Sequence, residues 1–357
     1  MRIHAIGIGG AGCRIADTLY RLRESYPVSD SIAAFDTDRE TLQSVESLPE
    51  EHSYLFGDDR SVGGLGGALD LGREIGTEYA DELDRALDRW VETDVEAFVF
   101  IVGFGGATGG GTVPTLIDRV RETFDVPVYV IGTLPTDDER TRTVRNAVET
   151  LDRLRERGVP VIGFDNELWL TPGERLTDAR DRLDEAIATR IAVLFGAGDR
   201  TDAGPIAQQV IDASDIDRVL GDDGAVATIG YATVDVEPPG PSSRFGLGLF
   251  EPKEEPTVDT SEAVSAIETA IRKAARGKQT LEPIDGRADR TLLVVGGPPE
   301  WLNRKAIADG RRWIAEETGS GAVLHGDDPT PEMYTIFSVV LRAGIESERL
   351  RWLRDRS

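Results

Sequence analysis

The 357-residue chain contains one cysteine, Cys13, and only three histidines. A single cysteine excludes an intrachain disulfide, as is usual in cytoplasmic proteins. With so few sulfur and imidazole groups we expect no structural metal site. The longest apolar runs, such as residues 97–103, fall far short of the roughly 20 residues that span a bilayer. The N-terminus also lacks a signal-peptide pattern. We therefore expect a cytoplasmic protein that does not insert into membranes.

Lysine is scarce as well, with four among 40 basic residues, against 65 acidic residues and a net charge of −25. A polyanion is repelled by DNA, RNA and anionic lipid, so we expect no nucleic-acid partner. Concentrated salt shortens the range of self-repulsion to a few Å. The composition is therefore interpreted as that of a protein from a halophilic organism.

Short apolar runs alternate with segments of helical periodicity in the first half of the chain. Strands that lack polar alternation and are each followed by a helix indicate a parallel sheet covered on both faces. Ligands of such sheets bind at the carboxyl ends of the strands. The predicted strands are residues 3–8, 32–35, 97–102, 126–132 and 159–164, and the predicted helices are 12–23, 69–91, 112–124, 139–155 and 174–195.

The second half follows a different pattern. Residues 237–258 are rich in proline, glycine and charge, and are interpreted as an extended loop. Beyond them, a helix (262–275), a strand (291–295), a helix (304–317) and a strand (333–341) are predicted. The expected fold is a Rossmann-like α/β domain over residues 1–198, joined by its long central helix, 174–195, to a smaller α+β domain over 199–357.

A first glycine loop, Gly7 to Gly12, separates the first strand from the first helix. Glycines let backbone N–H groups approach an anion, and a helix N-terminus adds positive potential. The loop also fits G-x-G-x-x-G, with Asp36 after the second strand where a dinucleotide fold places its ribose-binding acid. Tight-turn packing, NAD-type binding and binding of another phosphate ligand all remain open from this loop alone.

A second glycine loop, Gly103 to Thr112, directly follows the predicted strand 97–102. Each glycine in regular structure costs about 0.5–1 kcal/mol relative to alanine, so the run is interpreted as functional. It offers a nest of N–H groups and the Thr108 hydroxyl to a polyphosphate. A NAD-binding fold has no general use for this loop, and no G-K-[ST] follows as in a Walker loop.

At this point the chain resembles the tubulin/FtsZ superfamily, and the archaeal CetZ group in particular. The family signature GGGTG(T/S)G is similar to Gly105 to Gly111, with Ala107 in place of a glycine. The run that begins at Leu292 and continues through PPE and LNRK resembles a CetZ segment. The resemblance covers nearly the whole chain.

The resemblance implies a GTP or GDP site, with Mg²⁺ only as the companion of the nucleotide. In the family, two loops hold phosphates, a third faces the γ-phosphate, a Glu holds the ribose, and an Asn and the central helix contact guanine. The positions that match are Gly9, Gly10, Ala11, Gly12, Cys13 and Asp36; Gly66 in the third loop, SVGGLGGA; Gly105, Gly106, Ala107, Thr108, Gly109, Gly110 and Gly111; and Glu139, Asn166, Arg180 and Asp184.

The segment Asp212-Ala213-Ser214-Asp215 resembles the family loop whose acids complete the GTP site of the neighbouring subunit. Asp212 and Asp215 are therefore the expected catalytic residues, acting in trans on an attacking water. From spacing alone, two acids three residues apart on a helix are also common in so acidic a chain. The partner that the resemblance implies is a second copy in a head-to-tail filament serving cell shape, or a related family member.

Several positions depart from the family. Ala107 is tolerable only if its φ is negative. Ala68-Leu69 replace Asp-Asn in the third loop, and Arg180 stands where an aromatic ring stacks on the base. A guanidinium can stack on a purine, although an exposed helix charge is the alternative. Besides a GTPase, a non-hydrolysing nucleotide-binding paralogue and a Rossmann oxidoreductase are therefore considered.

Overall fold

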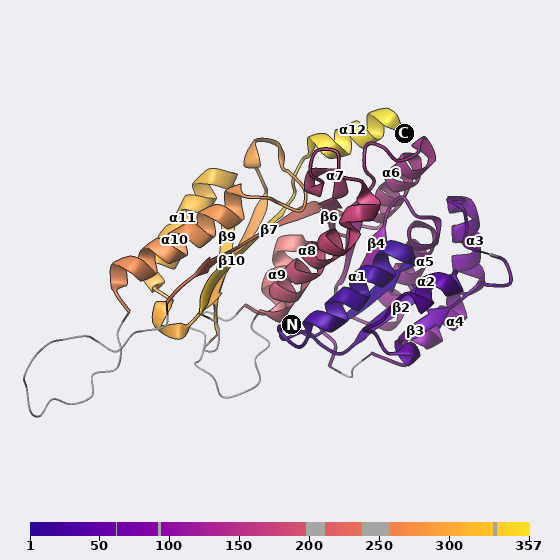
Figure 1. The fold of residues 1–357 in the computed structure, drawn as a ribbon, viewed down its shortest axis with the longest axis horizontal. Coiled ribbons are helices and arrows are strands. Elements are labelled where there is room, and N and C mark those ends of the chain that lie inside the picture. The colour runs from indigo at the N-terminus through magenta and orange to yellow at the C-terminus, as the bar shows by residue number, and fades with distance from the viewer. Residues whose placement is uncertain (62, 92–93, 198–210, 238–257, 331–333) are drawn as a thin grey trace, which may run out of the picture.

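The computed structural model describes residues 1–61, 63–91, 94–197, 211–237, 258–330 and 334–357. In this part of the chain the strands form one ten-stranded sheet in the order β3-β2-β1-β4-β5-β6-β7-β10-β8-β9 (Figure 1). The strands are β1 (Ile3–Ile8), β2 (Ile32–Asp36), β3 (Ser53–Leu55), β4 (Ala97–Gly103), β5 (Val128–Leu134), β6 (Val161–Asp165), β7 (Val226–Asp235), β8 (Arg290–Gly297), β9 (Ala322–Pro329) and β10 (Thr335–Ala343).

The sheet is parallel from β3 through β7, and β8 and β9 are parallel to each other. Only β10 runs antiparallel to its neighbours, β7 and β8. The carboxyl ends of β1, β4, β5 and β6 therefore lie at one edge, as the sequence predicted. The helices are α1 (Gly9–Leu22), α2 (Arg39–Gln43), α3 (Leu69–Glu78), α4 (Ala80–Leu87), α5 (Ala107–Thr123), α6 (Thr141–Glu156), α7 (Asn166–Trp169), α8 (Leu176–Gly196), α9 (Ala213–Leu220), α10 (Thr260–Arg276), α11 (Arg304–Thr318) and α12 (Glu348–Arg356).

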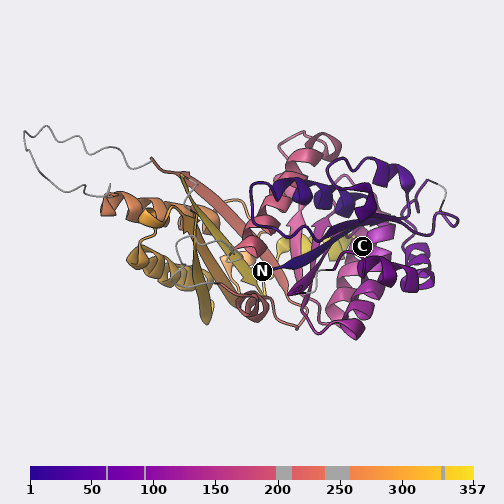
Figure 2. The same cartoon turned by 90° about the horizontal axis from the view of Figure 1, so that it is seen from below.

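Apolar strands buried on both faces separate two hydrophobic cores. On one face α1 and α8 pack side by side and contribute Ile15, Leu19, Ile187 and Ile191. The other face is covered by α3 to α6, with Val113 of α5 among its buried residues. Figures 1 and 2 show α8 beside α1, between the N-terminal lobe and the lobe built from α10, α11 and β8–β10.

Two predicted helices differ most from those observed. The helix predicted over 69–91 is divided into α3 and α4 at Tyr79, whose φ and ψ are −95° and 10°. The helix predicted from Thr112 begins five residues earlier, at Ala107. Glycine has a low helix propensity, so Gly109 to Gly111 do not indicate a helix in the sequence. In the structure they allow α5 to pack closely against α3. A methyl group at Gly111 would lie 2.6 Å from the Gly72 carbonyl carbon of α3.

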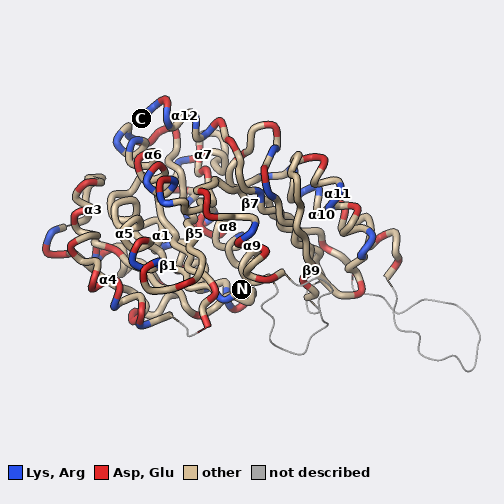
Figure 3. The backbone as a smooth tube through the Cα atoms, turned by 180° about the vertical axis from the view of Figure 1, so that it is seen from behind, with Lys and Arg blue, Asp and Glu red and all other residues tan. Residues whose placement is uncertain are grey.

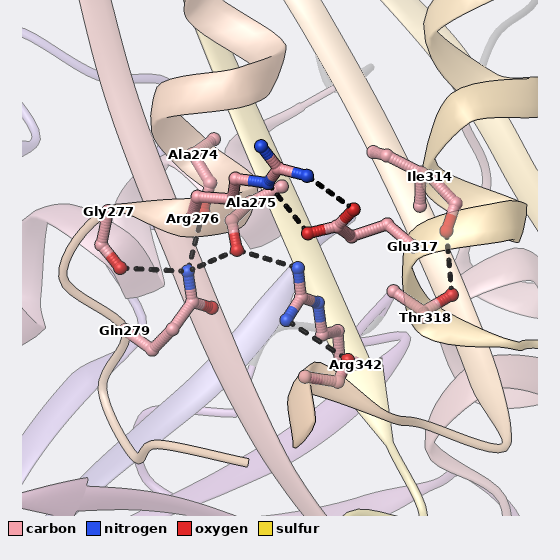
Figure 4. Close-up of polar contacts among 10 residues, drawn as sticks. Ala274, Ala275, Arg276, Gly277, Gln279, Ile314, Glu317, Thr318 and Arg342 are labelled. Atoms are coloured by element: carbon pink, nitrogen blue, oxygen red, sulfur yellow. Dashed lines mark hydrogen bonds and ion pairs between the residues drawn. The ribbon is translucent and has the colours of Figure 1, made fainter. Parts of the chain in front are cut away.

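The C-terminal lobe has a core of its own, in which α10 and α11 pack on the sheet. The buried carboxyl end of α10 is capped by side chains (Figure 4). Arg342 Nη2 donates to the Ala275 carbonyl at 2.7 Å, and Gln279 Nε2 donates to the same oxygen at 3.3 Å. Beside them Arg276 pairs with Glu317 of α11 through two bonds of 2.7 Å. The predicted loop 237–258 lies outside the described residues except for its two end positions.

The last helix, α12, returns to the N-terminal lobe and packs on α6. The Arg349 side chain, 10% exposed, forms ion pairs with Asp137 at 2.5 Å and Asp165 at 3.2 Å. It also donates a hydrogen bond to the Pro135 carbonyl. The C-terminus is thereby attached to the loop that follows β5.

Acidic and basic positions are mixed over both lobes (Figure 3), so the negative charge is not gathered into one patch. Among the described residues, no helix combines the length and the apolar character needed to cross a bilayer.

Candidate functional site

A cavity of about 400 Å³ lies at the carboxyl edge of the sheet, between α1, α5 and the first turns of α8. Its walls come from six separate stretches of the chain, and two of them contain the first and second glycine loops. The lining residues are Ile8, Gly9, Gly10, Ala11, Arg14, Gly67, Gly103, Gly105, Gly106, Ala107, Thr108, Gly109, Thr133, Leu134, Pro135, Glu139, Thr143, Asn166, Leu176, Arg180, Leu183 and Asp184.

The N-termini of α1 and α5 meet at one end of this cavity. Gly9 begins α1 with φ +75°, a conformation that favours glycine. A methyl group there would lie 3.0 Å from the Gly109 backbone nitrogen. First-turn N–H groups have no partner within their own helix, and both helix dipoles place positive potential here. The junction is therefore suited to an anion, polyphosphate included.

Ala107 is the first residue of α5, and its neighbour Gly106 has φ −80° and ψ 143°. Among the described non-glycine residues only Asp285 has a positive φ, so the φ of Ala107 is negative. The alanine therefore fits the loop without backbone strain.

Polar side chains at the end of β2 support the second glycine loop. The Thr37 and Thr108 hydroxyls lie 2.8 Å apart, and Asp36 Oδ1 accepts from the Thr37 backbone N–H at 2.7 Å. Burial raises the pKa of Asp36 to about 6, although its bonds to backbone N–H groups oppose the rise. Asp36 thus holds the turn on which Thr108 rests.

The other end of the cavity combines apolar and polar walls. Leu176 and Leu183 of α8 provide apolar surface, and Asn166, at the start of α7, is 8% exposed. Glu139 accepts from the Thr136 backbone N–H at 3.2 Å, and burial raises the pKa of its carboxyl group. Arg180 is exposed at the rim. This mixture is typical of a site for a small molecule with a flat, polar-edged group.

Asp184 is 7% exposed, and its Oδ2 accepts from Arg14 Nε at 2.9 Å. Arg14 Nη1 also donates to the Gly10 carbonyl at 2.9 Å. One guanidinium therefore joins the first glycine loop to α8. Burial raises the pKa of Asp184, and the positive charge of Arg14 opposes that rise.

The third glycine loop reaches the cavity through Gly67. Asn146 of α6 donates to the Gly67 carbonyl at 3.0 Å and to the Gly105 carbonyl at 3.1 Å, which fixes this loop to the second one. Ala68 forms no side-chain cap at the start of α3, and Leu69 is 6% exposed. The end of this loop therefore presents backbone and apolar groups.

Of the predicted nucleotide contacts, 12 line the cavity: Gly9, Gly10, Ala11, Gly105, Gly106, Ala107, Thr108, Gly109, Glu139, Asn166, Arg180 and Asp184. The remaining six, which do not line it, are Gly12, Cys13, Asp36, Gly66, Gly110 and Gly111. Gly12, Gly110 and Gly111 allow close packing of α1 and α5 against neighbouring backbone and side chains. The Cys13 thiol is buried and points to the Phe35 carbonyl oxygen, at 3.5 Å.

The predicted catalytic acids lie away from the cavity. Asp212 caps α9 by accepting from the Asp215 backbone N–H at 3.0 Å, and the Ser214 hydroxyl lowers its pKa. Further along α9, Asp217 accepts a hydrogen bond from the Tyr129 hydroxyl at the amino end of β5. The cavity adjoins the carboxyl end of the same strand. Leu176, at the start of α8, lines the cavity; the acids follow the far end of this helix, about 30 Å along.

Arg14, Thr133 and Thr143 were not placed in the site from the sequence. For Arg14 the available signal was a cation two residues beyond the first glycine loop, together with the acid Asp184 on the central helix that the resemblance brings to the nucleotide. The threonines carried no comparable signal.

Comparisons with known proteins agree along the whole chain. The profile of the Tubulin/FtsZ family GTPase domain matches residues 2–171, and that of the tubulin-like CetZ C-terminal domain matches residues 173–357. Tubulin-like protein CetZ1 of Haloferax volcanii is 35% identical over 351 residues, covering 97% of this chain and 88% of that protein.

Two solved structures extend the similarity to three dimensions. CetZ1 from Haloferax volcanii, as a GDP-bound monomer, gives a TM-score of 0.85 at 32% identity and covers 100% of this chain and 98% of the other. CetZ2 from the same organism, as a GTPγS-bound protofilament, gives 0.82 at 29% identity with 100% and 97% coverage.

Proposed function

This chain belongs to the Tubulin/FtsZ family, and within it to the CetZ group, and from that membership we propose that it binds GTP in the cavity between α1, α5 and α8. The observation that carries the proposal is the meeting of two helix N-termini at Gly9 and Gly109 in one cavity. The similar structures with bound GDP and GTPγS support it. A dehydrogenase would leave the second glycine loop unexplained, and family membership removes that alternative.

The groups in the cavity fit the parts of the nucleotide in order. First-turn N–H groups of α1 and α5 and the Thr108 hydroxyl bind phosphate oxygens. Glu139 accepts from the ribose hydroxyls. Asn166 and Asp184 meet the polar edge of guanine, and Arg180 stacks on its face. Mg²⁺ that binds with a nucleotide takes most of its ligands from phosphate oxygens and water. The cavity therefore needs no further protein group as a dedicated metal ligand.

We further propose that GTP is hydrolysed at the contact between two subunits. Asp212 and Asp215 lie too far from the cavity of their own chain, so they act on the cavity of the next chain in a head-to-tail filament. There the carboxylates position and polarise a water in line with the γ-phosphate. A head-to-tail contact that does not close generates a filament, as in the CetZ2 protofilament.

The catalytic assignment is tested by comparing GTP turnover with nucleotide binding. Changing Asp212 and Asp215 together to Ala is expected to abolish phosphate release from GTP while leaving the affinity for GDP intact. Asp222→Ala, which removes an exposed acid just beyond the same helix, is the matched control and is expected to keep full turnover. Unaltered phosphate release in the double variant would contradict the catalytic assignment.

Assembly is tested separately by sedimentation at high salt with GTP or GDP. Pelleting with GTP and release with GDP are expected of a nucleotide-controlled filament, and the role that we propose for such a filament is in cell shape. Identical pellets with both nucleotides, or none with either, would count against it.

A second candidate is a nucleotide-binding paralogue that hydrolyses little and co-assembles with a relative. The observation that favours it is the third glycine loop, where Ala68 and the buried Leu69 offer no polar side chain to a γ-phosphate. Phosphate release measured for this chain alone, and then mixed with a CetZ relative, separates the two. No release from this chain alone, together with a mixture that releases phosphate at a rate different from that of the relative by itself, would establish the paralogue.

A further inference from the structure

We propose that Arg14 selects the base: by pairing with Asp184 it keeps that carboxylate ionised and aimed at the cavity, and the site then accepts guanine and rejects adenine. This inference rests on the proposed function, because it concerns the base end of the proposed nucleotide site. It adds a positioning residue that acts through another side chain.

Two hydrogen bonds fix the Arg14 guanidinium between α1 and α8. Its Nε donates to Asp184 Oδ2 at 2.9 Å, and its Nη1 donates to the Gly10 carbonyl at 2.9 Å. Both Arg14 and Asp184 line the cavity. Two anchors leave the guanidinium little rotational freedom, so the carboxylate that it holds is fixed as well.

Hydrogen-bond chemistry links this pair to the choice of base. Guanine presents two adjacent donors, N1–H and N2–H, whereas adenine presents an acceptor, N1, beside the donor N6–H. An ionised carboxylate only accepts, and its two oxygens have about four lone-pair positions, so after the bond to Arg14 it can still accept twice from guanine. A protonated carboxyl group donates once and accepts once, which matches adenine. The protonation state of Asp184 therefore sets the preferred base.

Arg14 controls that protonation state. Asp184 is 7% exposed, and burial favours its neutral form. The charged groups that act on it are Arg14 of α1 together with Asp181 and Arg180 of α8. Asp181 disfavours ionisation, and Arg180 is exposed, so Arg14 is the charge in direct contact that keeps the group ionised. Without Arg14, the pKa of Asp184 moves upward.

The same two helices offer a matched control. Arg21 of α1 pairs with Glu185 of α8 at 3.1 Å, but both side chains are 57% exposed and neither lines the cavity. Arg21→Gln removes an ion pair between α1 and α8 without touching the site. Any effect of Arg14→Gln that Arg21→Gln lacks therefore belongs to the cavity.

The experiment measures the affinity for GDP and for ADP, with the full-length protein at high salt, from pH 8 to pH 5.5. For the wild type and Arg21→Gln, in which Asp184 stays ionised, we expect a nearly constant GDP affinity and a preference for GDP at every pH. For Arg14→Gln we expect the preference to fall with pH, by about tenfold for each unit below the raised pKa of Asp184. Arg14→Lys keeps the positive charge and is expected to restore much of the preference.

The outcomes separate the two proposals. A wild type that binds no guanosine nucleotide would contradict the proposed function. Normal GDP binding with a pH-independent preference in Arg14→Gln would overturn the role of Arg14 alone. Equal weakening of GDP and ADP at every pH in that variant would assign Arg14 to helix packing, which also overturns the inference.

Discussion

The glycine at the start of α1 offers a sharp test of how the two phosphate loops meet. Gly9 has φ +75°, and a methyl group on it would lie 3.0 Å from the Gly109 backbone nitrogen. An alanine in left-handed conformation costs about 1–2 kcal/mol. The methyl group would also lie between the backbone N–H groups of the first glycine loop and those of the second. Gly9→Ala is therefore expected to move the two loops apart.

The binding loss can be worked out from the same geometry. A hydrogen bond to a charged group contributes about 1.5–3 kcal/mol. Losing one such bond weakens the affinity about tenfold to 150-fold, and losing two multiplies these factors. We therefore expect Gly9→Ala to weaken GDP binding at least tenfold while the protein stays folded.

The next residue provides the control. Gly10 also lines the cavity, but its φ is not positive, and a methyl group there would meet only Arg14 Nη1 and Thr41 Cγ2, each at 3.9 Å. Gly10→Ala is expected to bind GDP within a few-fold of the wild type. Titration with a fluorescent GDP analogue, alongside thermal unfolding, compares the pair. Equal affinities in the two variants would refute the convergence of the loops at Gly9.

Three further predictions concern stability. Arg349→Met leaves the buried Asp165 without its cation; because burial already raises the pKa of Asp165 to about 6, we expect a loss of about 3–5 kcal/mol at pH 8. Without the cation the pKa of Asp165 rises further, so this loss should shrink as the pH falls toward 6 and stay small below it, and a pH-independent loss in urea unfolding would contradict the explanation. Gln279→Ala removes a buried donor from the end of α10 and is expected to cost about 1–3 kcal/mol, whereas Arg276→Ala breaks a partly exposed pair and should cost about 0–1 kcal/mol; equal losses would contradict the ranking. Burial lowers the pKa of His4 to about 4, below its unfolded value of 6.5, so the unfolded state binds the proton first and stability is lost as the pH falls below about 6.5. His4→Asn should remove up to about 3 kcal/mol of this acid sensitivity, and identical pH profiles would exclude it.

The parallel sheet was predictable because its strands are uninterrupted apolar runs. Residues 3–8 and 97–102 were predicted within a residue of β1 and β4, because each is a short apolar run that ends at a glycine loop, a pattern typical of strands buried on both faces. The strand β9 was missed for the opposite reason. It lies at the edge of the sheet and contains His325, Asp327 and Asp328, so no apolar run marks it.

Helix ends were harder to predict than helices. The start of α5 was placed too late because Gly109 to Gly111 have a low helix propensity. The close approach of α3, which the sequence does not show, is the reason for glycine at these positions. The break at Tyr79 likewise depends on how α3 and α4 pack. The domain boundary near residue 198 stays a prediction, since residues 198–210 lie outside the described part of the chain.

The site was predictable as far as it follows local motifs. The glycine loops, Glu139 and Asn166 each belong to a short pattern, and the fold brings them to one cavity. The pairing of Arg14 with Asp184 joins residues 170 positions apart, which no local pattern contains. Their roles toward a nucleotide stay predictions until a complex is examined.

The most direct measurement is a crystal structure of this chain grown with GTPγS. We predict guanine between Asn166 and α8, and phosphate oxygens within hydrogen-bond distance of backbone N–H groups in both glycine loops, near Gly10 and Thr108. A nucleotide bound elsewhere, or phosphates in contact with only one of the two loops, would contradict the account.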